Sequence, residues 1–427
     1  MLAIVALATD PRHSFFRVFG SFSLPPELLV DPLLSCPTAL WPRYLCIACT
    51  AGADLIFNLV FALPTLVVLT RWLWPLPLPF WAKLPIGLLM LAASQFHLWS
   101  RLSSGSVFAP EFPRLVVILF NWAFGALLLL AVMQLVVDVG ALLTMLVRHT
   151  KIREPAELRY GVAALAGLLA GIGVASALRV PPVRDVTVAI RGLPASFDGY
   201  GIVQLTDLHL SRLFTPAWAR AVVDRTNAAG ADLIVVTGDF IDGSVDMRRD
   251  DVEPLRRLRA PDGVYAIPGN HEYFFNYRAW IRHLSGMGFR MLPNAHAVVE
   301  RRGARLVIAG VTDLSAPNVG EAAPDLHLAL QGAPADAPAI LLDHQPRNAR
   351  DAAARGVALQ LSGHTHGGMI VVLDRLVARG NAGFVSGRYV IGSMTLYVSN
   401  GTGLWPGFAL RLGVPSEITR ITLRPTP

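Results

Sequence analysis

Acidic, amide and imidazole side chains recur in five short segments of the second half of the chain. They are, in chain order, Asp207-Leu208-His209, Gly238-Asp239, Gly269-Asn270-His271-Glu272, Asp343-His344 and Gly363-His364-Thr365-His366-Gly367-Gly368. As candidate ligands they offer two carboxylates, one amide oxygen and four or five imidazoles, and no cysteine. This set of donors suits divalent Mn, Fe, Zn or Co at a reactive centre better than a structural zinc site.

The spacing within the segments is also typical of a metal site. Residues i and i+2 of an extended backbone point to the same side, so Asp207 and His209 are expected to share one ion. His364 and His366 have the same spacing, and each is able to face a different ion. Asp239 is the natural carboxylate bridge, and the neighbouring glycines permit tight turns with positive φ.

Each segment alone has an ordinary structural explanation. Asp-x-His occurs by chance in many proteins, a lone buried histidine usually belongs to a core, and Gly-Asn-His-Glu is also a turn sequence. Five such segments in order, each after a predicted strand, favour one shared site.

Short β-branched runs separated by helical periodicity predict an α/β domain with mixed sheets. Strands are expected at Val186–Arg191, Ile202–Thr206, Leu233–Thr237, Val264–Ile267, Arg305–Val311, Ile340–Leu342, Ala358–Leu361, Arg388–Ile391, Leu396–Ser399 and Glu417–Leu423. Helices are expected at Pro216–Ala229, Val252–Leu258 and Tyr277–Met287. Every candidate segment then lies at the carboxyl end of a strand, where open α/β sheets bind ligands.

The first part of the chain has the composition of a membrane region. The whole chain is 53% hydrophobic and only 16% charged, which is apolar for a soluble protein. Four runs are expected to span a bilayer as helices: Ala53–Thr70, Ala82–Ser100, Leu115–Val147 and Tyr160–Leu178. We therefore predict a membrane domain over residues 1–180 and a catalytic domain over 181–427.

The charges between the last two runs predict the orientation. Arg148, Lys151, Arg153 and Arg159 form the densest basic cluster near a membrane end, and such loops face the cytoplasm. The catalytic domain would then lie outside, in the periplasm of a bacterial inner membrane; Arg12, Arg17 and Arg43 argue weakly for the opposite. Asp138 is interpreted as a residue where a long helix leaves the bilayer, with an intramembrane functional carboxylate as the alternative.

Other patterns exclude several classes of function. The net charge of +7 is spread thinly, and there is no basic run with interleaved aromatic residues, so no nucleic-acid partner is expected. Cys46 and Cys49 form a C-x-x-C within an apolar run and lack partners for zinc or redox chemistry. Met1–Asp10 lacks the basic start of a cleaved signal peptide. The sequence specifies no oligomeric state.

The series of five segments resembles the calcineurin-like metallophosphoesterase superfamily over about residues 185 to 425. The Glu after Asn-His, the Gly-Gly after His-Thr-His and the ending Gly413-Val414-Pro415-Ser416-Glu417-Ile418 resemble its membrane-associated bacterial branch. That branch includes YkuE-like and YaeI-like phosphodiesterases. The resemblance implies a four-layer α/β/β/α sandwich with a dinuclear metal site between the sheets.

The resemblance also implies the role of each residue. One ion would take Asp207, His209, Asp239 and His366, and the other would share Asp239 and add Asn270, His344 and His364. A water that bridges the two ions would become hydroxide and attack phosphorus in line. His271 would stabilise or protonate the leaving oxygen. Asp242, Asp313 and Asp343 are acidic neighbours outside this set, and Asp343 is interpreted as a supporting or turn residue.

Departures from the family pattern narrow the substrate. Gly238 to Gly243 read Gly-Asp-Phe-Ile-Asp-Gly, without the Arg of the family's protein phosphatases, which argues against a phosphoprotein. Met369 stands where this branch commonly has Gln. We therefore predict a membrane-anchored phosphoesterase that cleaves a phosphodiester, pyrophosphate or phosphomonoester bond. A lipid-linked substrate in the bilayer is one option.

Three alternatives stay open. Hydrolysis of UDP-2,3-diacylglucosamine requires a cytoplasmic sugar nucleotide, whereas the predicted topology places the catalytic domain in the periplasm. Of these two conflicting inferences, we prefer the topology. A phosphodiesterase for soluble nucleotides would use the spans only as an anchor. A non-catalytic membrane protein would use its metal site for binding or regulation.

Overall fold

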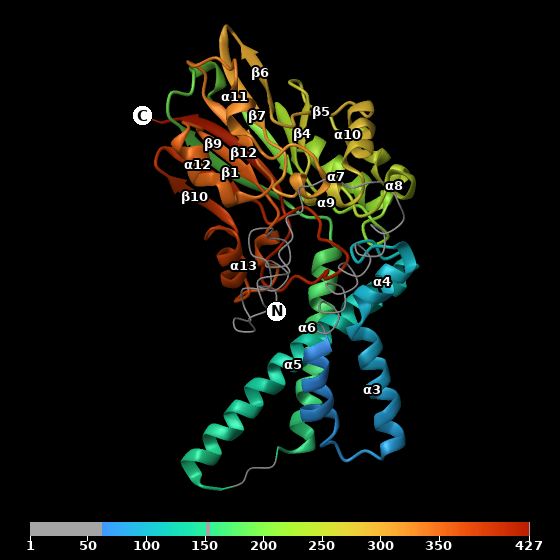
Figure 1. Cartoon of the computed structure of the whole chain (residues 1–427). Coiled ribbons are helices and arrows are strands. Elements are labelled where there is room, and N and C mark those ends of the chain that lie inside the picture. The colour runs from blue at the N-terminus through green and yellow to red at the C-terminus, as the bar shows by residue number, and fades with distance from the viewer. Residues whose placement is uncertain (1–61, 151–153, 427) are drawn as a thin grey trace, which may run out of the picture.

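The computed structural model describes residues 62–150 and 154–426, and these fall into two regions (Figure 1). The helical region comprises residues 62–150 and 154–178, and the sheet region comprises residues 183–426. Some residues on which sequence predictions rest lie outside the described residues: Met1–Asp10, the Cys46–Cys49 pair, the start of the first expected span, and, for the orientation, Arg12, Arg17, Arg43, Lys151 and Arg153.

Helices make up the whole ordered framework of the first region. They are the short apolar helix Ala62–Leu73, which ends in the π-helix η3 (Val68–Leu73), and α3 (Phe80–Ser94), α4 (Phe96–Ser104), α5 (Arg114–Arg148) and α6 (Ala156–Leu178). Within the described residues, α5 and α6 are the two helices that are long and apolar enough to cross a membrane. At 1.5 Å per residue, the 35 residues of α5 extend about 50 Å, well beyond a hydrocarbon core of about 30 Å.

The second expected span does not form one helix. The run from Ala82 to Ser100 is divided between α3 and α4, which meet at Gln95. The 15 residues of α3 reach only about 22 Å, too short for the hydrocarbon core by themselves. Phe96 and His97 of α4 are buried, and Phe96 stacks on Phe120 of α5. Hydropathy alone does not separate a lipid-facing helix from one that packs on protein, so the expectation of four spans is not confirmed.

Polar side chains of the helical region pair with one another. Asp138 accepts hydrogen bonds from Arg71 Nε at 2.9 Å and from Gln134 at 2.9 Å. Arg159 is buried and lies 2.5 Å from Glu154. Asp138 of α5 therefore forms an ion pair with Arg71 of η3. Arg159 lies in α6 and pairs with Glu154, although the orientation prediction counted it among the charges of a loop.

The first sheet of the second region carries three of the candidate segments. Its strands are, in spatial order, β1 (Val183–Ile190), β12 (Ile418–Pro425), β2 (Gly201–Leu205), β3 (Leu233–Thr237), β4 (Val264–Ile267) and β5 (Arg290–Met291). The strands from β2 to β5 are parallel, whereas β12 runs antiparallel to β2. The predicted bounds of β3 and β4 are correct to the residue, and β5 was not predicted.

The second sheet carries the other two segments. Its order is β10 (Gly387–Ile391), β11 (Met394–Val398), β9 (Leu359–Ser362), β8 (Ala339–Leu342), β7 (Ala304–Gly310) and β6 (Ala295–Arg301). The strands from β11 to β7 are parallel, and β10 and β6 are antiparallel to their neighbours. The edge strand β6 was not predicted, because Ala-His-Ala-Val-Val-Glu-Arg is weakly apolar.

Helices cover the outer faces of both sheets. They are α7 (Pro216–Ala228), α8 (Val245–Val252) and α10 (Tyr277–Gly286) on the first sheet, and α11 (Leu326–Leu330) and α12 (Ala349–Ala354) on the second. The short helices α9 (Asn270–Phe274) and α13 (Asp374–Gly380) lie instead beside the turns that follow β4 and β9. The helix expected at Val252–Leu258 is a 3-10 turn, Glu253–Arg257, that continues α8.

Alternate residues of the strands face different cores. Ile202 and Val235 face the other sheet and pack with Ile308, whereas Val203 and Ile234 face the helices on the outer side. A third core lies between the second sheet and α11 and α12. The order of layers is therefore helices, sheet, sheet, helices.

The two regions share one hydrophobic core. Leu410, in the loop after β11, packs so closely on α5 and α6 that a Cβ at Gly125 or Gly173 would lie within 3 Å of its side chain. Asn121 of α5 accepts a hydrogen bond from Ala409 N at 2.6 Å and donates to Pro406 O at 2.9 Å. The helical region is thus packed against the loops at the carboxyl ends of the strands.

Candidate metal centre

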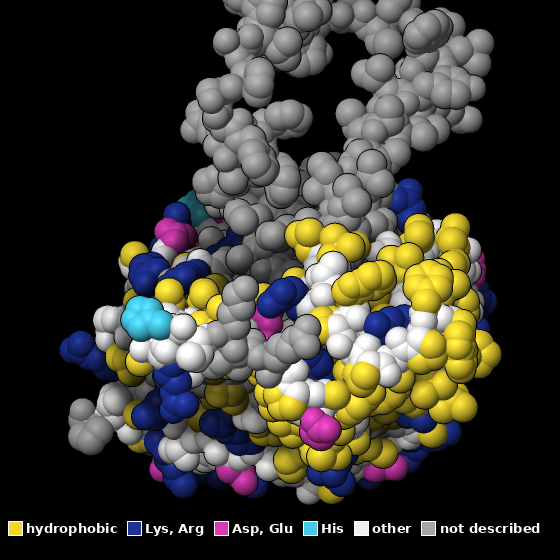
Figure 2. Space-filling view, turned by 90° about the horizontal axis from the view of Figure 1, so that it is seen from below, with side chains coloured by type: hydrophobic (Ala, Val, Ile, Leu, Met, Phe, Trp, Pro, Cys, Tyr) yellow, Lys and Arg dark blue, Asp and Glu magenta, His cyan; other side chains and the backbone are white. Residues whose placement is uncertain are grey.

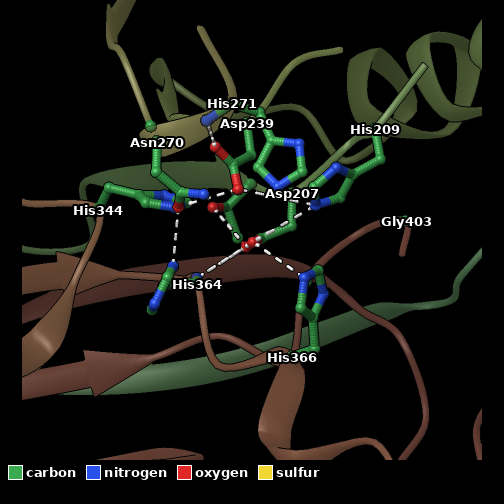
Figure 3. A network of polar contacts seen from close by, with 12 residues as sticks. Asp207, His209, Asp239, Asn270, His271, His344, His364, His366 and Gly403 are labelled. Atoms are coloured by element: carbon green, nitrogen blue, oxygen red, sulfur yellow. Dashed lines mark hydrogen bonds and ion pairs between the residues drawn. The ribbon is translucent and has the colours of Figure 1, made fainter. Parts of the chain in front are cut away.

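The candidate residues meet where five strands end. Asp207, Asp239 and Asn270 follow β2, β3 and β4, and His344 and His364 follow β8 and β9. Because parallel strands of both sheets end at this edge, residues far apart in sequence come together there. Figure 3 shows all eight predicted side chains around one centre: Asp207, His209, Asp239, Asn270, His271, His344, His364 and His366.

One group of ligand atoms comes from Asp207, His209 and His366. They lie within 4.8 Å of one another; Asp207 Oδ1 is 4.0 Å from His209 Nε2 and 3.6 Å from His366 Nε2. Ligands of one transition-metal ion, each about 2 Å from it, lie roughly 3–4 Å apart. Among the described residues, the buried His209 Nε2 has no hydrogen-bond partner. A divalent cation between these atoms would satisfy it.

A second group comes from Asp239, Asn270, His344 and His364. Asp239 Oδ2 and Asn270 Oδ1 lie 3.2 Å and 3.1 Å from His344 Nε2. Asn270 Oδ1 is also 2.9 Å from His364 Nδ1. Thr237 O lies 2.7 Å from His344 Nδ1, which favours a proton on Nδ1 and a lone pair on Nε2. Acceptors then converge at Nε2, and a cation there, either a metal ion or a second proton on His344, would satisfy them.

Asp239 lies between the two groups. Its Oδ2 is 3.7 Å from His209 Nε2 as well as 3.2 Å from His344 Nε2, and its Oδ1 accepts the His271 N–H at 2.9 Å. Burial opposes ionisation of this carboxyl, but His344 and His271 outweigh it and hold the pKa of Asp239 well below its ordinary value. A carboxylate in this place is suited to bridge two cations.

The backbone around the centre is strained. Left-handed φ values of 46° to 68° occur at Asp207, His209, Asp239, His364 and His366. Such values are uncommon outside glycine and gather at functional sites. The expectation that Asp207 and His209 lie along extended backbone was therefore wrong, since a sharp turn after β2 brings them together.

Two glycines allow the chain to approach the carboxylates. A Cβ at Gly269 would lie 2.2 Å from Asp239 Oδ1, and a Cβ at Gly363 would lie 2.3 Å from Asp207 Oδ2. Neither glycine has a positive φ. Their role is close packing and not the positive φ that the sequence analysis expected of them, whereas Gly238 does have a φ of 93°.

Asp242 joins the site, although the sequence analysis left it out. Its Oδ1 lies 2.5 Å from His271 Nδ1, and its Oδ2 lies 3.0 Å from His209 Nδ1. Burial lowers the pKa of His271, but Asp239 and Asp242 outweigh burial and raise that pKa to about 9. Its position three residues after Asp239, in the same turn, was the only signal of this role in the sequence.

Glu272 holds the turns that carry Asp239 and Asn270. Its carboxyl group accepts hydrogen bonds from the backbone N–H of Gly269 at 2.7 Å, Asp239 at 3.0 Å and Phe240 at 2.8 Å. Burial, together with Asp239, raises the pKa of Glu272 to about 8. Glu272 thus links the turn after β3, which carries Asp239, to the turn after β4, which carries Asn270.

The loop after β11 supports Asp207 from the other side. Gly403 N donates to Asp207 O at 2.8 Å, and Gly403 lies beside the centre in Figure 3. The buried Arg411 donates to the carbonyl oxygens of His366 at 3.0 Å, Asn400 at 2.6 Å and Gly403 at 3.0 Å. No motif in the sequence pointed to these contacts.

Asp313 and Asp343 lie behind the centre. Both oxygens of Asp313 accept from Gln345 Nε2, at 3.1 Å and 3.0 Å. Burial, with Asp313 nearby, raises the pKa of Asp343 to about 8. Neither carboxyl belongs to a described group of converging ligand atoms, in agreement with the interpretation of both as neighbours of the site.

Comparison with known proteins connects this geometry to a family. Residues 200–368 match the family model described as Calcineurin-like phosphoesterase. The chain is 35% identical over 272 residues to the zebrafish (Danio rerio) "Transmembrane protein with metallophosphoesterase domain", covering 61% of each chain. It is 32% identical over 278 residues to the metallophosphoesterase YkuE of Bacillus subtilis, covering 62% of this chain and 95% of YkuE. The chain thus spans less than two thirds of the zebrafish relative.

A solved structure shows a more distant similarity. The calcineurin-like phosphoesterase YfkN from Bacillus subtilis matches with a TM-score of 0.33 and 15% sequence identity. The match covers 48% of this chain and 81% of that chain.

Proposed function

The chain belongs to the calcineurin-like phosphoesterase family of metal-dependent hydrolases, and we propose that it is a membrane-anchored enzyme with two metal ions. Its reaction is hydrolysis of a phosphodiester, pyrophosphate or phosphomonoester bond. The observation that carries the proposal is the place of Asp239 Oδ2 between His209 Nε2 and His344 Nε2, at 3.7 Å and 3.2 Å.

The proposed ligands form two sets that share Asp239. One ion would be held by Asp207, His209, Asp239 and His366, and the other by Asp239, Asn270, His344 and His364. Two divalent cations so held would acidify water and neutralise charge on the phosphoryl oxygens. Mn, Fe, Zn and Co all suit these donors.

His271 is proposed to act on the leaving oxygen. Asp242 engages its Nδ1 at 2.5 Å, so Nε2 is the ring nitrogen that faces the substrate. A histidine whose pKa is raised carries a proton at neutral pH and can donate it to a departing alkoxide. Asp242 fixes the orientation of the ring.

The helical region is proposed as a membrane domain joined to the catalytic domain between Leu178, where α6 ends, and Val183, where β1 begins. Large apolar side chains of α5 are exposed, among them Leu143 at 57% and Val147 at 80%. Figure 2 views the molecule from below and shows hydrophobic side chains gathered over part of that side. We keep the proposal of a multi-pass protein of the bacterial inner membrane, with the catalytic domain in the periplasm.

The proposal is tested by hydrolysis of bis-p-nitrophenyl phosphate and p-nitrophenyl phosphate by the full chain in detergent. Turnover is expected with Mn²⁺ and is lost with EDTA or with Asp239→Asn. Asp336→Asn is the matched control, because Asp336 is 75% exposed and pairs only with Arg305 in the described structure. Turnover that survives EDTA and Asp239→Asn would refute the proposal. The ratio of the diester rate to the monoester rate indicates which of these two ester types the enzyme prefers.

A further inference from the structure

A loop of the helical region reaches the centre of the catalytic site. Phe108 lies between α4 and α5, and its ring is 5.3 Å from the ring of His271. Phe274, in α9, lies 5.2 Å from the same imidazole and stacks on Phe108 at 5.1 Å with an interplanar angle of 14°. The group proposed to protonate the leaving oxygen thus has two phenyl rings against it.

Trp405 completes this arrangement from the loop after β11. Its ring lies 5.7 Å from Phe108. We call Phe108, Phe274 and Trp405 the aromatic subsite. Phe274 is 38% exposed, and Phe108 and Trp405 are half-buried. The three rings are therefore partly exposed at the edge of the shared core, on which Trp405 packs.

The loop that carries Phe108 is fixed to the sheet region. Glu111 forms ion pairs with the buried Arg248 and with Arg212, the latter at 2.7 Å. Arg248 in turn donates to the backbone oxygen of Asp242 at 2.7 Å, and Arg114 Nε donates to Leu213 O at 3.1 Å. The same residue, Asp242, thus anchors both His271 and the loop.

The position of the subsite limits what can bind there. If His271 acts on the leaving oxygen as proposed, the carbon on that oxygen would lie next to the rings around His271. Burial of an apolar group against these rings is favourable, and the rings offer no partner to an anionic group. The leaving group is therefore expected to be apolar beside its oxygen.

Exposed apolar side chains also occur at both ends of the loop that carries Phe108 and along α5. Leu102 and Leu115 stand at the two ends of the loop that carries Phe108, and they are 69% and 66% exposed. Leu119 and Trp122 follow on α5, at 51% and 42%. An alkyl chain that emerges from the site can remain in contact with this surface, whereas a nucleoside base would occupy only the rings.

We propose that the aromatic subsite binds the alkyl chain of a lipid phosphoester taken from the bilayer that holds the helices. This inference rests on the proposed hydrolytic function and names its substrate class. The phosphate lies at the metal ions, the ester oxygen lies at His271, and the chain passes Phe108 toward the exposed side chains of α5.

Direct binding tests the inference without turnover. Calorimetry gives the dissociation constants of methylphosphonate and octylphosphonate for the Mn²⁺-loaded full chain in detergent, with empty micelles subtracted. The octyl chain is expected to improve binding by about 100-fold. Phe108→Ala should reduce that gain by about tenfold, whereas Phe108→Leu, which keeps an apolar side chain, should retain most of it.

The control is Phe80→Ala, because Phe80 is an exposed phenylalanine of α3 at 66%; it should retain the full gain. An octyl gain that is absent from the wild type, or unchanged by Phe108→Ala, would overturn the inference. So would a preference for adenosine monophosphate over ribose 5-phosphate that is lost in both Phe108 variants, since it would assign the rings to a base. Hydrolysis of bis-p-nitrophenyl phosphate, measured separately, reports whether the proposed function itself fails.

Discussion

The two regions of the molecule handle polar groups in different ways. In the sheet region, carboxylates and imidazoles are buried around one centre, on backbone with positive φ at Asp207, Asp239 and His364. In the helical region, apolar side chains are exposed, and charged groups such as Arg71 and Asp138 pair with one another. The sheet region thus has strained backbone at its candidate metal ligands, whereas the helical region exposes apolar side chains to its surroundings.

The boundary between these regions is not a simple linker. Leu410 belongs to the same hydrophobic core as Phe124 of α5 and Val203 of β2, and Phe108 touches His271. The helical region therefore has two parts: helices that face outward, and a loop that reaches the candidate active site.

The largest expected effect is at His271, on the catalytic side of the comparison. His271→Ala should lower kcat by about 10²- to 10⁴-fold, because the leaving oxygen loses its proton donor. Steady-state hydrolysis of an alkyl phosphodiester such as glycerophosphocholine measures this, because p-nitrophenolate would leave without a proton. His283→Ala, on the outer helix α10, serves as the control. A variant with wild-type kcat would show that His271 has no part in the reaction.

The second effect tests whether the regions share one core. Leu410→Ala should lower the free energy of unfolding by about 2–5 kcal/mol, because Leu410 is 1% exposed and fills the space beside Gly125 and Gly173. Chemical denaturation in detergent, followed by fluorescence, measures the change. Leu328→Ala, at a side chain 48% exposed, should have little effect. Equal stability of both variants would mean that the regions are independent.

The third effect concerns Asp242, which connects His271 to the loop of the helical region. Asp242→Asn should lower kcat by about 10- to 100-fold, because partners that orient an active-site histidine typically matter by that much. The alkaline limb of the pH profile of kcat should move to lower pH, because the carboxylate no longer raises the pKa of His271. Asp246→Asn is the control, at a carboxyl 87% exposed. An unchanged profile would contradict a positioning role.

The smallest effect is expected in the helical region. Asp138→Asn should change stability by no more than about 1 kcal/mol, because its partner Arg71 is 57% exposed and the pair is expected where α5 leaves the bilayer, and ion pairs that face water contribute little. Hydrolysis should be unaffected. Loss of activity in Asp138→Asn, with wild-type stability, would mean that the helices take part in the chemistry and would end the contrast between the regions.

The sequence was informative where residue type is limited by local physics. The bounds of β3 and β4 could be predicted because buried parallel strands are short apolar runs that end at polar turns. Asp207, Asp239 and His344 could be named because few other roles suit such residues at strand ends. By contrast, α4 was merged into a span because hydropathy averages over a window.

Other features depend on contacts that no local pattern records. Asp242, Asp313 and Asp343 looked alike in the sequence, and only the fold places Asp242 between His209 and His271. Phe108 precedes His271 by more than 150 positions, so their contact has no signal in spacing. The positive φ values at the candidate ligands follow from the packing of turns from two sheets, which sequence alone does not determine.

The most direct test of the account is the metal content of the purified full chain, measured by mass spectrometry beside the rate of hydrolysis. We expect two divalent ions per wild-type chain and per Asp336→Asn chain. Asp239→Asn should retain fewer ions and lose its turnover. Equal metal content in the wild type and in Asp239→Asn would contradict a shared bridge at Asp239, and with it the central claim.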